Sequence, residues 1–331
     1  MLEKEIKIRH CKLNNRLVMA PVALEKSDKG KVSNKLLAHY EERARGGCIG
    51  LVISEHTFVR EDGRASRNQL STAKDDDIAG LTMLADVIHK RGSKAVVQIS
   101  HAGAAITSKV VTCEGISPSG IANPNGALGG RELQATHAMS VEEIHEIVKA
   151  FAQAAVRVKK AGFDGVEIHS AHGYLLNQFY SPLTNHRRDE YNGNTIPGRT
   201  KIHQEIIKSV RKAVGSDLLI GIRLGACDYM PGGSTVEDGV KAAEIFEAVG
   251  ADFIDVSGGM CFFTRPGHKE PGYFGNASAA IKRSVSIPVI LAGGVKTRVD
   301  AEKLLLEDKA DLIASGREIM KDALWADRLF Q

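Results

Sequence analysis

The sequence of 331 residues lacks several features that define whole classes of protein. No apolar stretch approaches the roughly 20 residues that a transmembrane helix needs. The first residues, 1–8, alternate charged and apolar side chains instead of forming a signal-peptide core. The formal net charge is only +4, and no lysine–arginine run marks a surface for nucleic acid or membrane. We therefore expect a soluble, cytoplasmic protein that binds neither nucleic acid nor membrane.

Cysteine and aromatic residues are also scarce. The five cysteines form no CxxC pair, which argues against a zinc ribbon, an iron–sulfur cluster and a disulfide framework. Aromatic residues make up 5% of the chain, so a stacking platform has to come from local residues such as Phe262 and Phe263. No GxGxxG follows the first predicted strand, which disfavours a doubly wound sheet that binds a dinucleotide.

The chain does contain a repeated alternation of short apolar runs and helix-like segments. The eight runs that we predict as strands are residues 17–20, 50–53, 94–98, 165–168, 218–223, 253–256, 288–292 and 311–314. Ser140, Thr235, Thr297 and Asp75 are predicted to cap helices between them. This alternation predicts an α/β fold, a closed parallel (β/α)8 TIM barrel forming one domain over residues 1–331. Residues 6–13 are predicted to form a β-hairpin that covers the bottom of the barrel.

The most informative segment follows the fourth predicted strand and places two imidazoles and a phenol within six residues. In a barrel, side chains at the carboxyl ends of the strands converge on one site. His169 and His172 can donate N–H groups to a carbonyl oxygen or an oxyanion, and Tyr174 can supply a proton. Surface or capping histidines are the alternative interpretation of an isolated HxxH pair.

Other strand ends point to an anionic ring ligand that carries a phosphate. Gln98 can both donate to and accept from a pyrimidine edge, and a buried Arg223 needs an anionic partner. Glycines after the seventh and eighth strands let backbone N–H groups approach a phosphate, which Arg317 can also bind. The alternative interpretation of the glycine pairs is a tight turn, and the alternative interpretation of Arg223 is a structural salt bridge. FMN fits this set of candidate cofactor residues, which comprises Gln98, Arg223, Gly293, Gly294, Ser315, Gly316 and Arg317.

In its motifs the chain resembles the old yellow enzyme family of FMN-dependent NAD(P)H:flavin oxidoreductases and ene-reductases, especially the bacterial single-barrel branch. The matching segments are residues 15–21, 98–103, 167–174, 181–191 and 316–317. The resemblance implies a tightly but non-covalently bound FMN whose ring is lined by Ala20, Pro21, Val22, Ala23, His56 and Gln98. It also implies that Arg223 lies near the N1/O2 edge of the flavin, and that Gly294, Gly316 and Arg317 hold the phosphate.

The resemblance further implies a reaction in which NADH or NADPH, as co-substrate, reduces the flavin. Hydride transfer from FMN N5 would then reduce the C=C bond of an α,β-unsaturated carbonyl compound or a related electrophile. His169 and His172 would hold the carbonyl oxygen and Tyr174 would protonate the α-carbon. Glu25, Phe262 and Phe263 are expected to border the substrate pocket.

Several positions depart from the family pattern, three of them at the expected flavin and substrate site. Ala23 stands where a redox-tuning Cys or Thr is usual, Glu25 replaces an expected Tyr, and His56 occupies a position that is usually small. These departures leave the physiological substrate open among electrophilic alkenes and quinones. The choice of nicotinamide and a homo-oligomeric state are open as well.

Two other functions remain as alternatives. The first is a general NAD(P)H:flavin or quinone reductase without a committed alkene substrate. The second is a metal-dependent barrel hydrolase with Glu167, His169 and His172 as ligands and Asp228 as a further carboxylate. The hydrolase would leave Gln98, Arg223 and the Gly316–Arg317 pair without a purpose, so we expect no metal.

Overall fold

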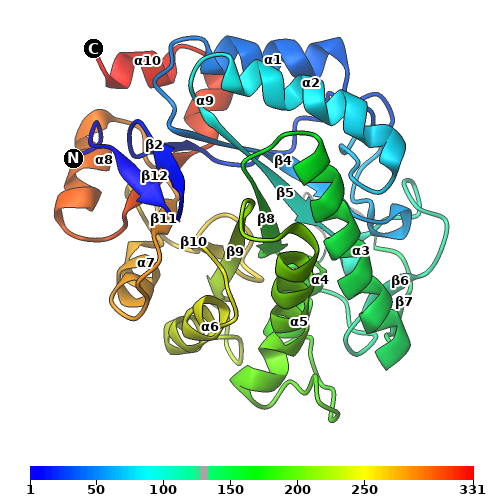
Figure 1. Ribbon diagram of the computed structural model, residues 1–331. Coiled ribbons are helices and arrows are strands. Elements are labelled where there is room, and N and C mark those ends of the chain that lie inside the picture. The colour runs from blue at the N-terminus through cyan, green and yellow to red at the C-terminus, as the bar shows by residue number, and fades with distance from the viewer. Residues whose placement is uncertain (125, 127–132) are drawn as a thin grey trace.

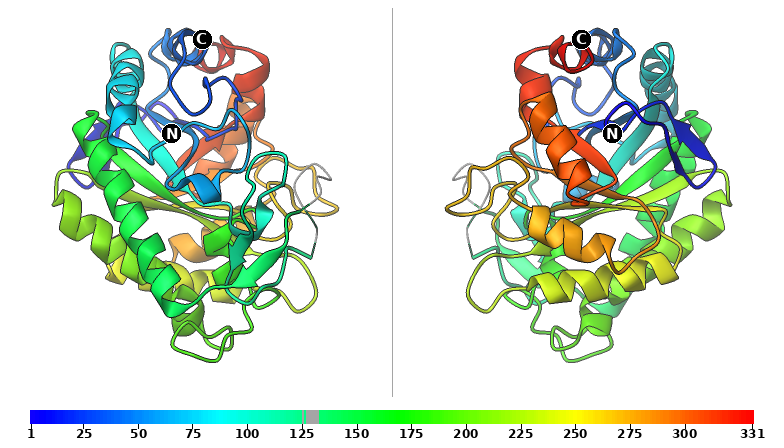
Figure 2. Two further views of the ribbon diagram at one scale, coloured as in Figure 1. Left: turned by 90° about the vertical axis from the view of Figure 1, so that its right-hand side faces the viewer. Right: turned by 90° about the vertical axis from the view of Figure 1, so that its left-hand side faces the viewer.

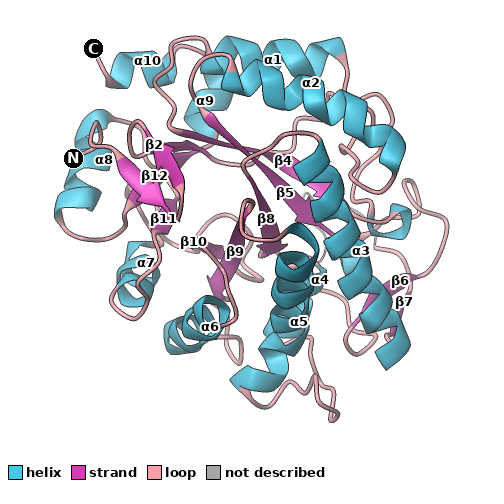
Figure 3. Ribbon diagram, in the orientation of Figure 1, coloured by secondary structure: helices cyan, strands magenta, loops and turns pink. Residues whose placement is uncertain are grey.

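The computed structural model describes residues 1–124, 126 and 133–331. Eight parallel strands form a closed barrel in the order β10-β11-β12-β3-β4-β5-β8-β9, with helices packed around it (Figures 1 and 3). The strands are β3 (Leu17–Met19), β4 (Leu51–Phe58), β5 (Lys94–Ser100), β8 (Gly165–Ser170), β9 (Leu219–Cys227), β10 (Phe253–Gly258), β11 (Val289–Ala292) and β12 (Leu312–Ser315). The predicted (β/α)8 TIM barrel is confirmed.

The longer helices are α1 (Asn34–Ala44), α2 (Ile78–His89), α3 (Val141–Lys160), α5 (Ile196–Val214), α6 (Val236–Ala248), α7 (Gly275–Lys282) and α8 (Arg298–Leu306). The shorter ones are α4 (Leu175–Tyr180), α9 (Arg317–Lys321) and α10 (Trp325–Leu329). Outside the barrel, β6 (Gly115–Ser117) pairs with β7 (Thr136–Ala138). In the described part of the chain, no helix has the length and apolar character that crossing a membrane requires.

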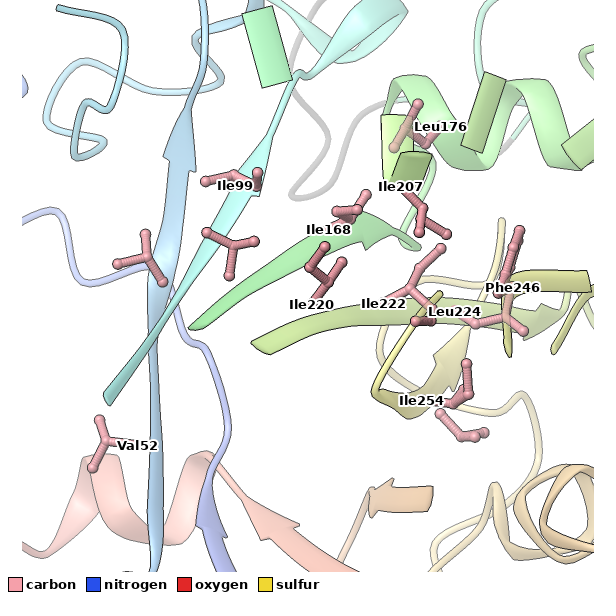
Figure 4. Close-up of a cluster of buried hydrophobic side chains, with 14 of the residues drawn as sticks. Val52, Ile99, Ile168, Leu176, Ile207, Ile220, Ile222, Leu224, Phe246 and Ile254 are labelled. Atoms are coloured by element: carbon pink, nitrogen blue, oxygen red, sulfur yellow. The ribbon is translucent and has the colours of Figure 1, made fainter. Parts of the chain in front are cut away.

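The barrel strands are buried on both faces, which explains why they are near-continuous apolar runs in the sequence. Outward-facing side chains such as Ile168, Ile222 and Leu224 pack against the helices through partners such as Ile207 and Phe246 (Figure 4). A second cluster of apolar side chains fills the inside of the barrel. It comprises Val18, Leu51, Ile53, Val96, Leu219, Phe253, Ile290 and Leu312, together with residues of the N-terminal hairpin.

The hairpin formed by β1 (Ile6–Ile8) and β2 (Cys11–Leu13) closes one end of the barrel. Ile8 and Leu13 are at most 1% exposed and join the inner apolar cluster, and each such side chain contributes roughly 1.5–3 kcal/mol when buried. Arg9 donates to the Asp252 carboxylate at 3.0 Å. Figure 2 shows the hairpin at one end of the barrel and the loops around β6 and β7 at the opposite end. The predicted position of the hairpin is therefore confirmed.

Three of the four predicted caps are present. Ser140, Thr235 and Thr297 each form a capping box with the residue three positions later. The prediction for Asp75 is wrong. This residue lies in a 3-10 turn before α2, and its carboxylate accepts from Arg157 at 2.7 Å instead of capping a helix.

The structure also corrects several strand ends. His56, Gln98 and Arg223 were predicted to follow or end their strands, whereas β4, β5 and β9 continue beyond them. His169 likewise lies inside β8. The strands continue because main-chain pairing with their neighbours continues, even where polar side chains replace apolar ones.

Candidate active site

A cavity of about 480 Å³ lies at the carboxyl ends of the barrel strands. The structure brings nearly all of the predicted site residues to its wall. These are Ala20, Pro21, Val22, Ala23, Glu25, His56, Gln98, His169, His172, Tyr174, Arg223, Phe263, Gly293, Gly294, Ser315, Gly316 and Arg317. Phe262 is not among the lining residues; it occupies a left-handed turn with φ +63°. The contacts of these residues with a ligand stay predictions.

His169 and His172 lie side by side on this wall, with ring centroids 5.1 Å apart. The Tyr174 ring approaches His169 edge-on, also at 5.1 Å. His172 adopts φ +59°, in the left-handed region that disfavours most side chains, and its Nε2 lies 2.8 Å from the Ser257 hydroxyl. Gly173 follows at φ +73°, and a Cβ there would lie 2.0 Å from the Asn123 amide nitrogen. This turn therefore fixes the direction of the His172 ring.

Both imidazoles of the pair are electrically neutral at pH 7. Burial lowers the pKa of His169 well below its ordinary value, with His172 and His56 lowering it further. Burial also lowers the pKa of His172, and Arg223 adds to that effect. A neutral imidazole carries one N–H donor and one acceptor nitrogen. The pair can therefore donate hydrogen bonds to a ligand oxygen without adding charge to the cavity.

A third imidazole, His56, reaches the same wall from β4. Its ring centroid lies 5.4 Å from that of Tyr174 and 6.4 Å from that of His169. The Gln69 amide nitrogen lies 2.9 Å from His56 Nδ1, while Gln69 Oε1 accepts from the Ala65 backbone N–H at 2.7 Å. Because Gln69 must then donate to Nδ1, the neutral imidazole carries its hydrogen on Nε2. The sequence analysis predicted that His56 lies near the flavin, but it did not predict the approach of its ring to Tyr174.

Gln98 and Arg223 form a polar part of the wall. The Gln98 side-chain nitrogen donates to Glu167 Oε2 at 2.5 Å. Arg223 Nη1 lies 3.4 Å from Asp255 Oδ2, so the structural salt bridge considered for Arg223 is present. The buried Nε of Arg223 has no hydrogen-bond partner among the described residues. The guanidinium therefore retains a donor that a ligand can use.

The opposite part of the wall is built by the ends of β11 and β12. Gly293 and Gly294 adopt φ values of +129° and +71°, and a Cβ on Gly316 would lie 2.8 Å from the Val22 side chain. Arg317 donates to the Tyr273 hydroxyl at 3.0 Å, and that hydroxyl donates to a backbone oxygen at 2.8 Å. The lining cations here are Lys296, Arg317 and Lys321. This part of the cavity suits a phosphate group.

Sequence reasoning missed several of these residues. Tyr273 comes from the long loop after β10, and Lys321 from the end of α9, where nothing local marks a site. Lys296 lies two residues after Gly294, so it could have been included among the predicted phosphate-site residues. Ser257 comes directly after the predicted sixth strand, residues 253–256, and could have been found by the same strand-end rule. With them, the residues present fit FMN, since hydrogen-bonding groups, a free guanidinium donor and a cationic end share one cavity.

The geometry disfavours the metal-dependent hydrolase. Glu167 accepts from Gln98 inside the barrel, whereas His172 contacts Ser257, so the proposed ligands face different partners. Asp228 accepts from the Ser181 hydroxyl and from backbone N–H groups. In residues 1–124, 126 and 133–331, no group of three or more His, Cys, Asp or Glu side chains could hold a metal ion.

Comparison with known proteins identifies relatives over nearly the whole chain. Residues 2–331 match the NADH:flavin oxidoreductase / NADH oxidase family. The chain is 37% identical to an NADPH dehydrogenase of Halalkalibacterium halodurans, covering 95% of this chain and 89% of that protein. It is also 37% identical to an NADH oxidase of Thermoanaerobacter brockii, covering 98% of this chain but only 50% of that longer protein.

Solved structures show the same barrel. A 2-naphthoyl-CoA reductase complex superposes with a TM-score of 0.91 at 26% identity, covering 99% of this chain and 52% of that one. An old yellow enzyme homologue from Zymomonas mobilis superposes with a TM-score of 0.86 at 24% identity, covering 99% and 92% of the two chains. At 24% identity, the comparison with the Zymomonas mobilis protein shows a shared fold only.

Proposed function

The chain belongs to the NADH:flavin oxidoreductase / NADH oxidase family, and from this premise we propose that it is an FMN-dependent ene-reductase that uses NAD(P)H. Its substrate would be an α,β-unsaturated carbonyl compound or a related electrophilic alkene. FMN, when bound, supplies the hydride chemistry that protein side chains cannot perform. The observation that carries the proposal is the wall of two neutral imidazoles and a phenol within one cavity.

In this proposal, His169 and His172 bind the carbonyl oxygen of the alkene. As hydride adds to the β-carbon, negative charge grows on that oxygen, and N–H donors that are already oriented stabilise it. A single donor of this kind is typically worth about 2.7–4 kcal/mol. The Ser257 contact and the left-handed turn hold His172 in one orientation, so little reorganisation is needed.

Tyr174 is the proposed proton donor to the α-carbon. Its ring lies beside His169, so its hydroxyl can reach an alkene whose carbonyl is bound there. Positioned general acids contribute roughly 10²–10⁴-fold to rate.

Gln98, Arg223, Gly294, Gly316 and Arg317 are proposed to bind FMN. Gln98 and Arg223 supply hydrogen-bonding groups for the flavin ring, and Arg223 adds positive charge. The glycines and Arg317 supply the phosphate site. NADH and NADPH are both retained as donors, because the relatives are named for each of them.

The second candidate function is a general NAD(P)H:flavin or quinone reductase. It is favoured by the names of the relatives, NADH oxidase and NADPH dehydrogenase, which specify a donor and no alkene. A quinone accepts its protons on oxygen and can take them from solvent. Such an enzyme would therefore have no need for Tyr174 as a proton donor to carbon.

Tyr174→Phe separates the two candidates. We expect the variant to bind FMN and to be reduced by NAD(P)H at the wild-type rate. Its reoxidation by 2-cyclohexenone should slow by about 10²–10⁴-fold, while reoxidation by a quinone should not change. Stopped-flow absorbance of the two half-reactions measures these rates. Unchanged reoxidation by the enone would refute the role of Tyr174, and a purified protein without flavin absorption would refute the proposed function.

A further inference from the structure

Two buried carboxyl groups lie directly behind the polar wall of the cavity. Glu167 on β8 and Asp255 on β10 are both 0% exposed, and neither lines the cavity. They alternate with Gln98 on β5 and Arg223 on β9, and these four strands are consecutive in the barrel. Gln98 pairs in register with Glu167, and Arg223 with Asp255. Gln98 and Arg223, which line the cavity, thus each have a buried carboxyl group behind them.

The hydrogen bonds of this cluster are incomplete as long as both carboxyl groups are ionised. Glu167 Oε2 accepts from Gln98, but Glu167 Oε1 has no donor among the described residues. The same holds for both oxygens of Asp255, whose contact with Arg223 spans 3.4 Å. Two carboxylates would also face a single guanidinium, leaving one uncompensated negative charge. Burying such a charge costs several kcal/mol.

One proton between the carboxyl groups removes both problems. A protonated Glu167 can accept through Oε2 and donate through Oε1, and Asp255 is the acceptor with which it interacts. Adjacent carboxyl groups commonly share a proton for this reason. Burial raises the pKa of Glu167, with Asp255 raising it further against the opposing effect of Arg223. Burial also raises the pKa of Asp255, and Arg223 opposes that rise.

Because Arg223 contacts Asp255 and stabilises its negative charge, the proton resides on Glu167 at neutral pH. The charged or titratable groups that act on Glu167 are Asp255 and Arg223. His169, two residues further along β8, is neutral and lines the cavity instead. The cluster as a whole then carries no net charge, with Asp255 negative and Arg223 positive.

We propose that Glu167 is a positioning residue that stays protonated, accepting from Gln98 and donating to Asp255, and thereby sets the charge that Arg223 presents to FMN. This inference rests on the proposed use of FMN. The chain Gln98–Glu167–Asp255–Arg223 orients the amide and the guanidinium together. Reduction of the cofactor adds negative charge to it, so any loss of positive charge from this wall disfavours the reduced form.

Infrared spectroscopy of the full-length protein tests the proton itself. Burial raises the pKa of Glu55 as well, so the measurement uses a Glu55→Gln background, in which Glu167 is the glutamate expected to hold a proton. With ¹³C-labelled glutamate, this protein should show the C=O stretch of a protonated glutamic acid at pH 7, fading as the pH rises. Adding Glu167→Gln should remove this band. The absence of any protonated glutamic acid band at pH 7 in the Glu55→Gln protein would overturn the inference. This measurement needs no turnover, so it stands apart from the fate of the ene-reductase proposal.

The midpoint potential of bound FMN tests the consequence. Glu167→Gln mimics the neutral acid, so we expect the wild-type potential to fall more steeply than that of the variant between pH 7 and pH 9. Asp255→Asn removes the negative partner of Arg223 and should favour reduced FMN about tenfold, which is about 30 mV for a two-electron couple. Parallel pH profiles, or an unmoved potential in Asp255→Asn, would overturn the inference. If Glu167→Gln does not fold, the infrared titration of the Glu55→Gln protein still decides.

Discussion

His172 offers the sharpest test of how the cavity would stabilise charge, because three substitutions separate its backbone role from its side-chain role. The residue adopts φ +59°, a conformation that glycine adopts freely and asparagine tolerates. His172→Gly keeps the turn and removes the N–H donor. His172→Asn keeps both the turn and a side-chain N–H. His172→Ala removes the donor and also places a methyl-bearing residue in the left-handed region.

The expected magnitudes follow from the geometry. The ring centroids of the two imidazoles lie 5.1 Å apart and both rings are neutral, so in the proposed function each would contribute one uncharged donor to the same ligand oxygen. Removing one oriented donor typically lowers the rate by about 10²–10³-fold, which we expect for His172→Gly. His172→Asn should stay within about tenfold of the wild type, since it retains a donor. His172→Ala should match the glycine variant in rate but lose about 1–2 kcal/mol of stability through backbone strain.

The assay is reoxidation of chemically reduced enzyme by 2-cyclohexenone, followed by stopped-flow absorbance. Starting from reduced enzyme removes any contribution from binding of the nicotinamide. Thermal unfolding of the three variants measures the backbone effect separately. If His172→Gly reoxidises within twofold of the wild type, the oxyanion role is wrong. If the glycine and asparagine variants are equally slow, the ring and not the N–H donor is what the reaction requires.

Further predictions concern the cofactor, the pH dependence of stability and the hairpin. Arg317→Ala should weaken FMN binding to the apoprotein by about 10–100-fold, as loss of a charged hydrogen bond does, and an unchanged dissociation constant in a fluorescence titration would contradict the phosphate role. Burial raises the pKa of Glu55 from 4.5 to about 8, so the folded protein holds a proton that the unfolded chain releases, and stability should fall as pH rises between these values. Glu55→Gln should flatten that fall in thermal unfolding, whereas parallel profiles would refute it. Asp252→Ala should cost about 1–3 kcal/mol in chemical denaturation, because Arg9, Arg211 and a backbone N–H lose their acceptor. A loss under about 0.5 kcal/mol, ordinary for surface changes, would show that the hairpin does not depend on this contact.

The barrel was predictable because strands buried on both faces leave a strong trace in the sequence. Each parallel strand appears as a short apolar run between turn residues, and the period of the repeat limits the topology to few choices. The hairpin was predictable for a similar reason, since its apolar residues alternate around Arg9–His10. The prediction that Asp75 caps a helix failed because Asp75, Asp76 and Asp77 are equally good local candidates for the cap. The contact with Arg157, 82 residues away in sequence, decided the outcome.

The site was predictable where it follows strand ends and unpredictable where loops supply it. His169, Gln98 and Arg223 lie on barrel strands, so the convergence rule places them together even though the strand ends were misjudged. Tyr273 reaches the cavity from a loop whose path depends on tertiary contacts such as its hydrogen bond with Arg317. The pairing of Glu167 with Gln98 depends on strand register, which a single sequence does not specify.

The charged residues around the cavity favour a substrate without negative charge. Lys296, Arg317 and Lys321 line the cavity where the phosphate is expected to bind, whereas Arg223 lies near enough to the two imidazoles to lower their pKa values. The two imidazoles offer hydrogen-bond donors without charge, because burial keeps His169 and His172 neutral. Glu25 is exposed, lines the cavity and adds a negative charge. We therefore expect Glu25 to repel an anionic acceptor, whereas a neutral enone or quinone would not be repelled.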